Sequence, residues 1–232
     1  MFVDICDRKC YYTIDRLLHY VFLVRNVLMT LRSLEKMNYS EVIDFVKERL
    51  ATTTRSDNYP FRNRFEHTMR VYRWAIRLQA KLGGDLDVIV LAALLHDVGW
   101  EEGRPHGEVS AEIAVEYLDS IGIDSETITK VGEIIMIHSD KDTEKNLSLE
   151  CRIVMDADLL DEVGAIGIMW DCMATAIMDE PTYKKAYYRI KEYYRQNKPK
   201  IKRCKTDAGR TEFSRRMQTI ENYIYQLERE LF

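Results

Sequence analysis

The pair His96-Asp97 has the clearest potential for chemistry in this sequence. It directly follows the unbroken apolar octet VIVLAALL of residues 88–95, within the segment LLHDVGW. A carboxylate near the C-terminal end of a helix opposes the helix dipole, and burying its charge is costly unless a cation or hydrogen-bond donors compensate it. The pair therefore indicates a place for a positive group, although a His and an Asp that merely end the helix before Gly99 would give the same pattern.

A second histidine lies in the segment RFEHTMRVYRWA. One face of the predicted helix carries four residues at i, i+3, i+4 and i+7, namely His67, Arg70, Val71 and Trp74. The imidazole and the guanidinium therefore point the same way along an apolar stripe. A lone histidine in such a place is more often a core residue than a ligand, so the weight of His67 depends on the other motifs.

Three aspartates are framed by apolar residues in the segment IVMDADLLDEVGAIG, namely Asp156, Asp158 and Asp161. Acids on a protein surface are rarely enclosed in this way, so at least one of the three should face inward. The alternative is that Asp156 or Asp158 caps a helix that begins near Leu159, and we expect this for one of the two.

Together these motifs resemble the HD-domain superfamily, whose pattern is a His, a His-Asp pair and a distant Asp on helices around a divalent metal. The order and the rough spacing agree over residues 67–158. The resemblance is closest to the small bacterial HD hydrolases, which share LLHDVGW, a following HG and DADLLDEVGAIG. It extends more weakly over about residues 38–231, and it implies an all-α HD-domain helical bundle and a metal-dependent phosphohydrolase.

The resemblance assigns the metal to four residues, His67, His96, Asp97 and Asp158. Asp158 is preferred to Asp156 because the family ligand falls three residues before the following acidic position, here Asp161. Imidazole and carboxylate ligands suit Mn²⁺, Mg²⁺, Fe²⁺, Co²⁺, Ni²⁺ or Zn²⁺. The resemblance favours Mn²⁺ or Mg²⁺.

Further residues have expected roles beside this metal. In some HD proteins, histidines that match His106 and His138 bind a second metal, and in others they contact phosphate or protonate the leaving group. A solvated loop residue and a core histidine are the respective alternatives. His138 is the first choice for proton transfer, and Arg70 is a candidate phosphate ligand because its planar fork matches phosphate oxygens. The candidates for a base or for orienting a ligand are Glu101, Glu102 and Asp161.

The rest of the sequence is typical of a water-soluble helical protein. Of its 232 residues 46% are hydrophobic and 31% charged, and four prolines and ten glycines leave few interruptions. No alternating strand pattern of useful length is present, and residues 52–60 are predicted to form a loop. Helices are predicted over residues 14–35, 39–50, 62–82, 85–98, 107–121 and 124–138, two or three more over 148–197, and a last one over about 207–231.

The formal charge of −4 gives no general attraction to nucleic acid or to an anionic membrane, which need a positive field. The apolar stretch of residues 20–31 is broken by Arg25 and Asn26 and is too short to span a bilayer. We therefore expect neither a nucleic acid polymer nor a membrane as partner. Scattered cysteines in an odd number favour reduced thiols and a cytoplasmic location; they are Cys6, Cys10, Cys151, Cys172 and Cys204.

The expected substrate is a small phosphorylated molecule. The basic segment of residues 184–210 is a candidate contact for it. This segment carries eleven Lys or Arg against two acids, interleaved with tyrosines. Such a mixture could bind nucleotide phosphates and stack a base, although a solvated helix that balances the acidic remainder explains it better. A hard cation, Arg70 and this segment together suit a nucleoside di- or triphosphate, so nucleotide pyrophosphohydrolysis ranks above removal of a monophosphate.

Two other functions fit the same motifs. A di-iron HD-type oxygenase would require both His106 and His138 as ligands, and a regulatory nucleotide-binding module would keep the metal without turnover. The first 36 residues depart from the family pattern, so we expect an N-terminal helical extension over residues 1–36 and an HD domain with C-terminal helices over residues 37–232. Met37 would also make a plausible start of a shorter form. A dimerisation or lid helix would explain the extension, and a homodimer is one assembly that it would allow.

Overall fold

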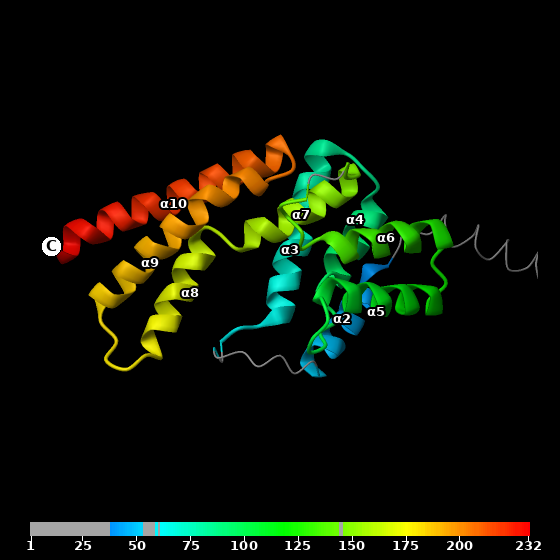
Figure 1. Cartoon of the computed structure of the whole chain (residues 1–232), viewed down its shortest axis with the longest axis horizontal. Coiled ribbons are helices and arrows are strands. Elements are labelled where there is room, and N and C mark those ends of the chain that lie inside the picture. The colour runs from blue at the N-terminus through cyan, green and yellow to red at the C-terminus, as the bar shows by residue number, and fades with distance from the viewer. Residues whose placement is uncertain (1–37, 53–58, 60, 144–145) are drawn as a thin grey trace, which may run out of the picture. The chain divides into compact units, whose positions relative to one another are not determined.

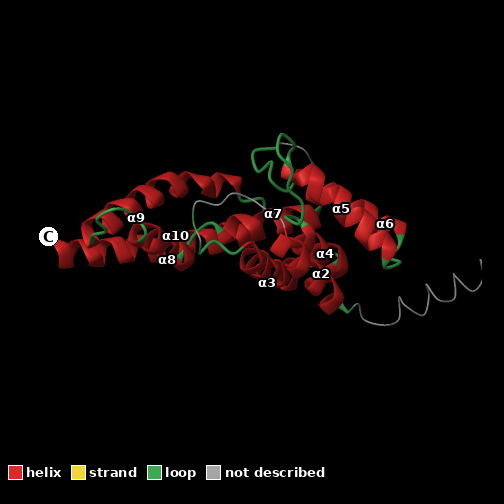
Figure 2. Ribbon diagram, turned by 90° about the horizontal axis from the view of Figure 1, so that it is seen from below, coloured by secondary structure: helices red, strands yellow, loops and turns green. Residues whose placement is uncertain are grey.

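The computed structural model describes residues 38–52, 59, 61–143 and 146–232. The chain divides into two units, Met1–Tyr39 and Ser40–Phe232. The predicted helix over residues 14–35 lies outside the described residues, and so does most of the predicted loop over residues 52–60. In the described part every regular element is a helix (Figures 1 and 2), which confirms the all-α fold class.

The helices begin and end close to the predicted residues. Both Asp156 and Asp158 lie inside a helix, so the expectation that one of them caps a helix near Leu159 is wrong. None of the described helices combines the length and the apolar composition that a bilayer span needs. The elements in chain order are α2 (Tyr39–Thr52), α3 (Arg64–Leu82), α4 (Leu86–Leu95), α5 (His106–Ser120), α6 (Ser125–Ile137), α7 (Leu149–Asp161), α8 (Ala165–Ala176), α9 (Tyr183–Asn197), the 3₁₀ helix η1 (Lys198–Arg203) and α10 (Asp207–Leu231).

Helix α4 forms the centre of the core. Asp85 begins it by accepting hydrogen bonds from the backbone N–H groups of Asp87 and Val88, and all of residues 88–95 are buried. A helix that is apolar on every side must be covered on every side, and α4 contacts α3, α6 and α7. The C-terminal end of α4, where His96 follows, is therefore held within the bundle.

Helix α3 lies against both α4 and α7. Asn63 caps its N-terminus by accepting from the N–H of Glu66, and Gly83, with φ of 80°, ends it. The predicted end of this helix at residue 82 is thus confirmed, and glycine suits the position after it because a positive φ favours glycine. Val71, Ala75 and Leu78 are buried on one face, and His67 and Arg70 in the first two turns bond to Asp161 of α7.

Helices α8, α9 and α10 pack on one another, and α10 also contacts α7 and α3 (Figure 1). Asp156 of α7 fastens the start of α10, because its carboxylate accepts from the N–H of Lys205 at 2.6 Å, the N–H of Thr206 at 2.8 Å and the Thr206 hydroxyl at 2.7 Å. A Cβ on Gly209 would lie 2.2 Å from this carboxylate. The close approach of α10 to α7 therefore requires glycine at this position.

Candidate metal centre

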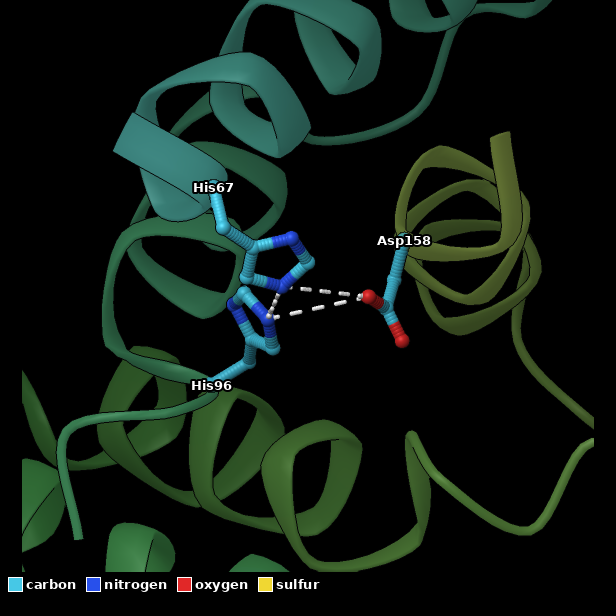
Figure 3. Close-up of side chains that lie close together, drawn as sticks. All are labelled: His67, His96 and Asp158. Carbon is cyan, nitrogen blue, oxygen red and sulfur yellow. Dashed lines mark hydrogen bonds and ion pairs between the residues drawn. The ribbon is translucent and has the colours of Figure 1, made fainter. Parts of the chain in front are cut away.

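Four ligand atoms from three helical segments converge at one place. His67 comes from the first turn of α3, Asp158 from the last turn of α7, and His96 and Asp97 from the end of α4. Nε2 of His67 lies 3.3 Å from Nε2 of His96, 3.4 Å from Asp158 Oδ1 and 3.7 Å from Asp97 Oδ2. Figure 3 shows three of these side chains directed toward one another.

Local hydrogen bonds leave a lone pair on each of the two Nε2 atoms. His96 is the C-cap of α4, and its Nδ1 donates to the carbonyl of Ala93 at 2.9 Å, one of the carbonyls left open at a helix end. Nδ1 of His67 donates to Asp161 Oδ2 at 2.7 Å. Each neutral ring then presents an acceptor at Nε2, so two imidazole lone pairs face each other beside two carboxylates.

This donor set fits a divalent cation. With both rings neutral, these four acceptors repel one another unless a positive charge, either a proton or a metal ion, lies among them. Metal–ligand bonds of about 2.0–2.2 Å place neighbouring ligand atoms roughly 3 Å apart or slightly more, and the observed spacings begin at 3.3 Å. His67, His96 and Asp158 form one group able to hold an ion, and His96, Asp97 and His138 form another.

A second cluster shares Asp97 through its other oxygen. Asp97 Oδ1 lies 3.5 Å from Nε2 of His106 and 3.8 Å from Nε2 of His138, and these two nitrogens are 3.3 Å apart. His138 is the C-cap of α6, and its Nδ1 donates to the carbonyl of Ile135 at 2.6 Å. It therefore repeats the arrangement of His96 at the end of α4, with Nε2 again presented beyond the helix.

Arg70 and Asp161 form a bidentate pair beside His67. Nε and Nη2 of Arg70 donate to the two carboxylate oxygens of Asp161 at 2.7 and 3.0 Å. The side chain of Asp161 is 5% exposed, and that of Arg70 is 31% exposed. Asp161 thus orients the ring of His67, while Arg70 holds Asp161 and keeps part of its guanidinium accessible.

Two basic residues at the site gave no signal in the sequence analysis. Lys141 Nζ donates to Asp158 Oδ2, and Nη1 of Arg64 lies 3.5 Å from Asp97 Oδ2. Lys141 belongs to the polar segment HSDKDTEK after α6, which has the composition of a surface turn. Only its position three residues after His138 connects it with the site.

The charges at the site act on one another strongly. Burial raises the pKa of Asp158, but Lys141 and the imidazoles outweigh this and hold that pKa well below its usual range. Burial lowers the pKa of His67, but the hydrogen bond to Asp161 and the charges of Asp158 and Asp97 raise it overall. For His138, burial together with repulsion from His96 lowers the pKa to about 4, so this ring is neutral at pH 7.

The other residues considered in the sequence analysis make ion pairs elsewhere or are exposed. Glu101 binds Arg104 at 3.1 Å, and Glu102 is exposed. Many basic side chains of residues 184–210 are paired with acids of the same chain, and Tyr187 is buried, which favours the interpretation of this segment as a source of counter-charges. These ion pairs include Lys191–Glu228, Lys198–Glu221, Lys200–Glu162, Arg189–Asp171 and Arg203–Asp142.

Comparison with known proteins places this geometry in a family. The HD domain matches residues 64–162, which contain all of the donor residues described above. The chain belongs to the HD-domain superfamily. It is 30% identical over 139 residues to an uncharacterized protein of Clostridium beijerinckii, covering 57% of this chain and 81% of the relative. It is 26% identical over 171 residues to the uncharacterized protein YpgQ of Bacillus subtilis, covering 72% of this chain and 83% of YpgQ.

Solved structures of other bacterial proteins share the fold. An HD-superfamily hydrolase from Bacillus thuringiensis is similar with a TM-score of 0.62 and 25% identity, over 82% of this chain and 94% of that protein. The crystal structure of Bacillus subtilis YpgQ in complex with ADP is similar with a TM-score of 0.59 and 26% identity, over 82% of this chain and 93% of YpgQ. The similarity covers more than nine tenths of both solved proteins and 82% of this chain, so it extends beyond the HD match of residues 64–162.

Proposed function

We propose that this protein is a metal-dependent phosphohydrolase that acts on a small phosphorylated substrate, most suitably a nucleoside di- or triphosphate. The observation that carries the proposal is that the Nε2 atoms of His67 and His96 lie 3.3 Å from each other and 3.4 to 3.9 Å from carboxylate oxygens of Asp97 and Asp158. We assign the catalytic metal to His67, His96, Asp97 and Asp158, with Mn²⁺ or Mg²⁺ as the favoured ion. Such an ion would activate water and polarise a phosphoryl oxygen.

The side chains around this centre suit a phosphate ester. The accessible part of the Arg70 guanidinium can donate to phosphate oxygens while Asp161 holds the other part in place. His138 is neutral at pH 7 and presents a lone pair at Nε2, so it is suited to accept a proton and not to donate one. The structure of YpgQ with ADP supports a nucleotide as the ligand class.

The test is hydrolysis of a nucleotide panel. We expect the purified full chain with Mn²⁺ to convert nucleoside triphosphates to monophosphate and pyrophosphate, separated from orthophosphate by chromatography. If orthophosphate were released from monophosphates and triphosphates were not cleaved, the activity would be removal of a monophosphate and not nucleotide pyrophosphohydrolysis. The absence of hydrolysis of every nucleotide with Mn²⁺, Mg²⁺, Co²⁺ and Zn²⁺ would refute the nucleotide proposal and leave the family assignment unchanged.

A di-iron oxygenase is the second candidate, because one observation favours it. His106, His138 and the second oxygen of Asp97 form a donor set next to the first, as a pair of metals sharing one carboxylate would require. Protein produced in iron-supplemented cells would then contain two tightly held iron ions per chain. It would also consume oxygen when its substrate is added. One tightly held ion together with phosphate ester hydrolysis would exclude this reading.

A further inference from the structure

Lys141 is buried in the turn after α6, next to a proposed metal ligand. Its side chain is 8% exposed, and its Nζ donates a hydrogen bond to Asp158 Oδ2. The other oxygen of this carboxylate, Oδ1, faces Nε2 of His67 at 3.4 Å and Nε2 of His96 at 3.9 Å. One carboxylate oxygen of Asp158 therefore faces a lysine, and the other faces the two imidazole rings.

The turn that carries Lys141 is fastened to the segment before α10. Arg203 donates to the two oxygens of Asp142 at 2.9 and 2.8 Å, and Nζ of Lys205 donates to the carbonyl of Thr143 at 2.9 Å. Both residues that follow Lys141 are therefore held from outside the turn. This bracing keeps the ammonium group at a fixed place relative to α7, because the same segment is bonded to α7 through Asp156.

We propose that Lys141 is a positioning residue for metal binding, which holds Asp158 so that Oδ1 alone is presented to the ion. The inference rests on the metal centre proposed above and is independent of the nucleotide. A carboxylate can offer either oxygen, or both, to a cation. The bond from Lys141 to Oδ2 selects one oxygen, and its positive charge offsets one of the buried carboxylates before an ion arrives.

If Lys141 acted through its charge alone, its removal would change metal affinity in the opposite direction to removal of a positioning hydrogen bond. The ammonium group repels a dication, so its removal would tighten metal binding if Coulomb repulsion were its only influence. If Lys141 acts through its hydrogen bond, its removal leaves Oδ2 buried without a donor and lets the carboxylate turn away from its binding orientation. Metal binding would then weaken, as it does when hydrogen-bond partners of metal ligands are removed.

The deciding experiment measures Mn²⁺ affinity by calorimetry on the metal-free full chain. We expect Lys141→Met to bind Mn²⁺ about 10- to 100-fold more weakly than the wild type. Lys202→Met is the matched control, because it makes the same change at an exposed lysine of η1, and it should keep the wild-type affinity. Lys141→Arg retains a charged donor for Oδ2 and should recover part of the loss.

The comparison requires folded variants, and two outcomes would refute the positioning role of Lys141. Circular dichroism sets a temperature at which all variants are folded, and Lys141→Gln replaces Lys141→Met if the latter does not fold. An affinity of the variant equal to or tighter than that of the wild type overturns the positioning role, and so does an Arg variant as weak as the Met variant. A wild type that binds no Mn²⁺, Mg²⁺ or Fe²⁺ refutes the metal centre as well, whereas normal wild-type binding with an unaffected variant refutes only the role of Lys141.

Discussion

The two donor clusters that meet at Asp97 differ in how their ligands are held. The cluster at Oδ2 of Asp97 contains the imidazoles of His67 and His96 and a second carboxylate, that of Asp158. Two of these ligands have hydrogen-bond partners of their own, since Lys141 bonds to Asp158 and Asp161 bonds to His67. Among the described residues, the cluster at Oδ1 brings together His106, His138 and the shared carboxylate. The second carboxylate, Asp158, with the bonds that Lys141 and Asp161 make to the ligands, predicts tight binding of one ion on the first side and weaker binding of a second ion on the other side.

The number of histidines does not distinguish the two clusters. Each cluster has two imidazoles whose Nε2 atoms lie 3.3 Å apart, and each contains a histidine that ends a helix and donates to the carbonyl three residues earlier. The buried carboxylates distinguish them. Substitution of the aspartates should therefore change metal binding differently at the two clusters.

Asp97→Asn should have the largest effect, because Asp97 belongs to both clusters. We expect the variant to lose its tightly bound ion and, with it, on the order of a thousand-fold in turnover, which corresponds to several kcal/mol of transition-state stabilisation. Metal analysis and circular dichroism should show an empty but helical protein. A variant that keeps a full complement of metal and near wild-type turnover would show that the site lies elsewhere.

Asp161→Asn should weaken the first cluster without removing a ligand. Asp161 fixes the ring of His67 through Nδ1, and loss of its charge should lower Mn²⁺ affinity about 10- to 100-fold. Glu101→Gln is the control, because Glu101 is bound to Arg104 at the surface. Equal Mn²⁺ affinity of the Asp161 variant and this control would mean that the ring of His67 needs no support from Asp161.

His106→Ala should leave the tightly bound ion in place, because only the second cluster contains His106. We expect one Mn²⁺ per chain with the wild-type affinity, and the loss of any second, weaker phase in the calorimetric titration. His96→Ala is the comparison on the first side, where the tight phase should disappear. If His106→Ala abolished the tight phase instead, the order of the two clusters would be reversed.

The sequence contained enough information to predict the helices and to predict which four proposed ligands lie close together. The unbroken run of residues 88–95 predicts a central helix, and α4 is buried over all of these residues. The boundary between the helices predicted over residues 62–82 and 85–98 agrees with α3 and α4, because Gly83 and Asp85 act on their own neighbours in the chain. The donor residues His67, His96, Asp97 and Asp158 are brought together by the packing of α3, α4 and α7, in agreement with the family order.

The partners of these ligands could not be predicted, because they depend on long-range packing. Arg70 shares a helix face with His67, but its bond to Asp161 joins residues 91 positions apart. Lys141 resembles any lysine of a polar turn until the packing of α6 and α7 places it against Asp158. Asp156 was expected to compete with Asp158 as a ligand or cap, and its true partners lie about fifty residues later.

Asp156→Ala should have the smallest effect on metal binding and a clear effect on stability. Asp156 is two residues from Asp158 on α7, but its oxygens accept from Lys205 and Thr206 at the start of α10. Without the carboxylate, buried donors there lose their acceptor, which costs about 1–3 kcal/mol, and a protein of this size loses about 2–4 °C in Tm per kcal/mol. Calorimetry should show a lower Tm, while Mn²⁺ affinity measured at a temperature where the variant is folded should equal that of the wild type. Asp156→Asn keeps an acceptor and should lose less stability than Asp156→Ala. A large loss of Mn²⁺ affinity in a folded Asp156→Ala protein would show that fastening α10 to α7 also sets the position of Asp158, and the two aspartates would then not act independently.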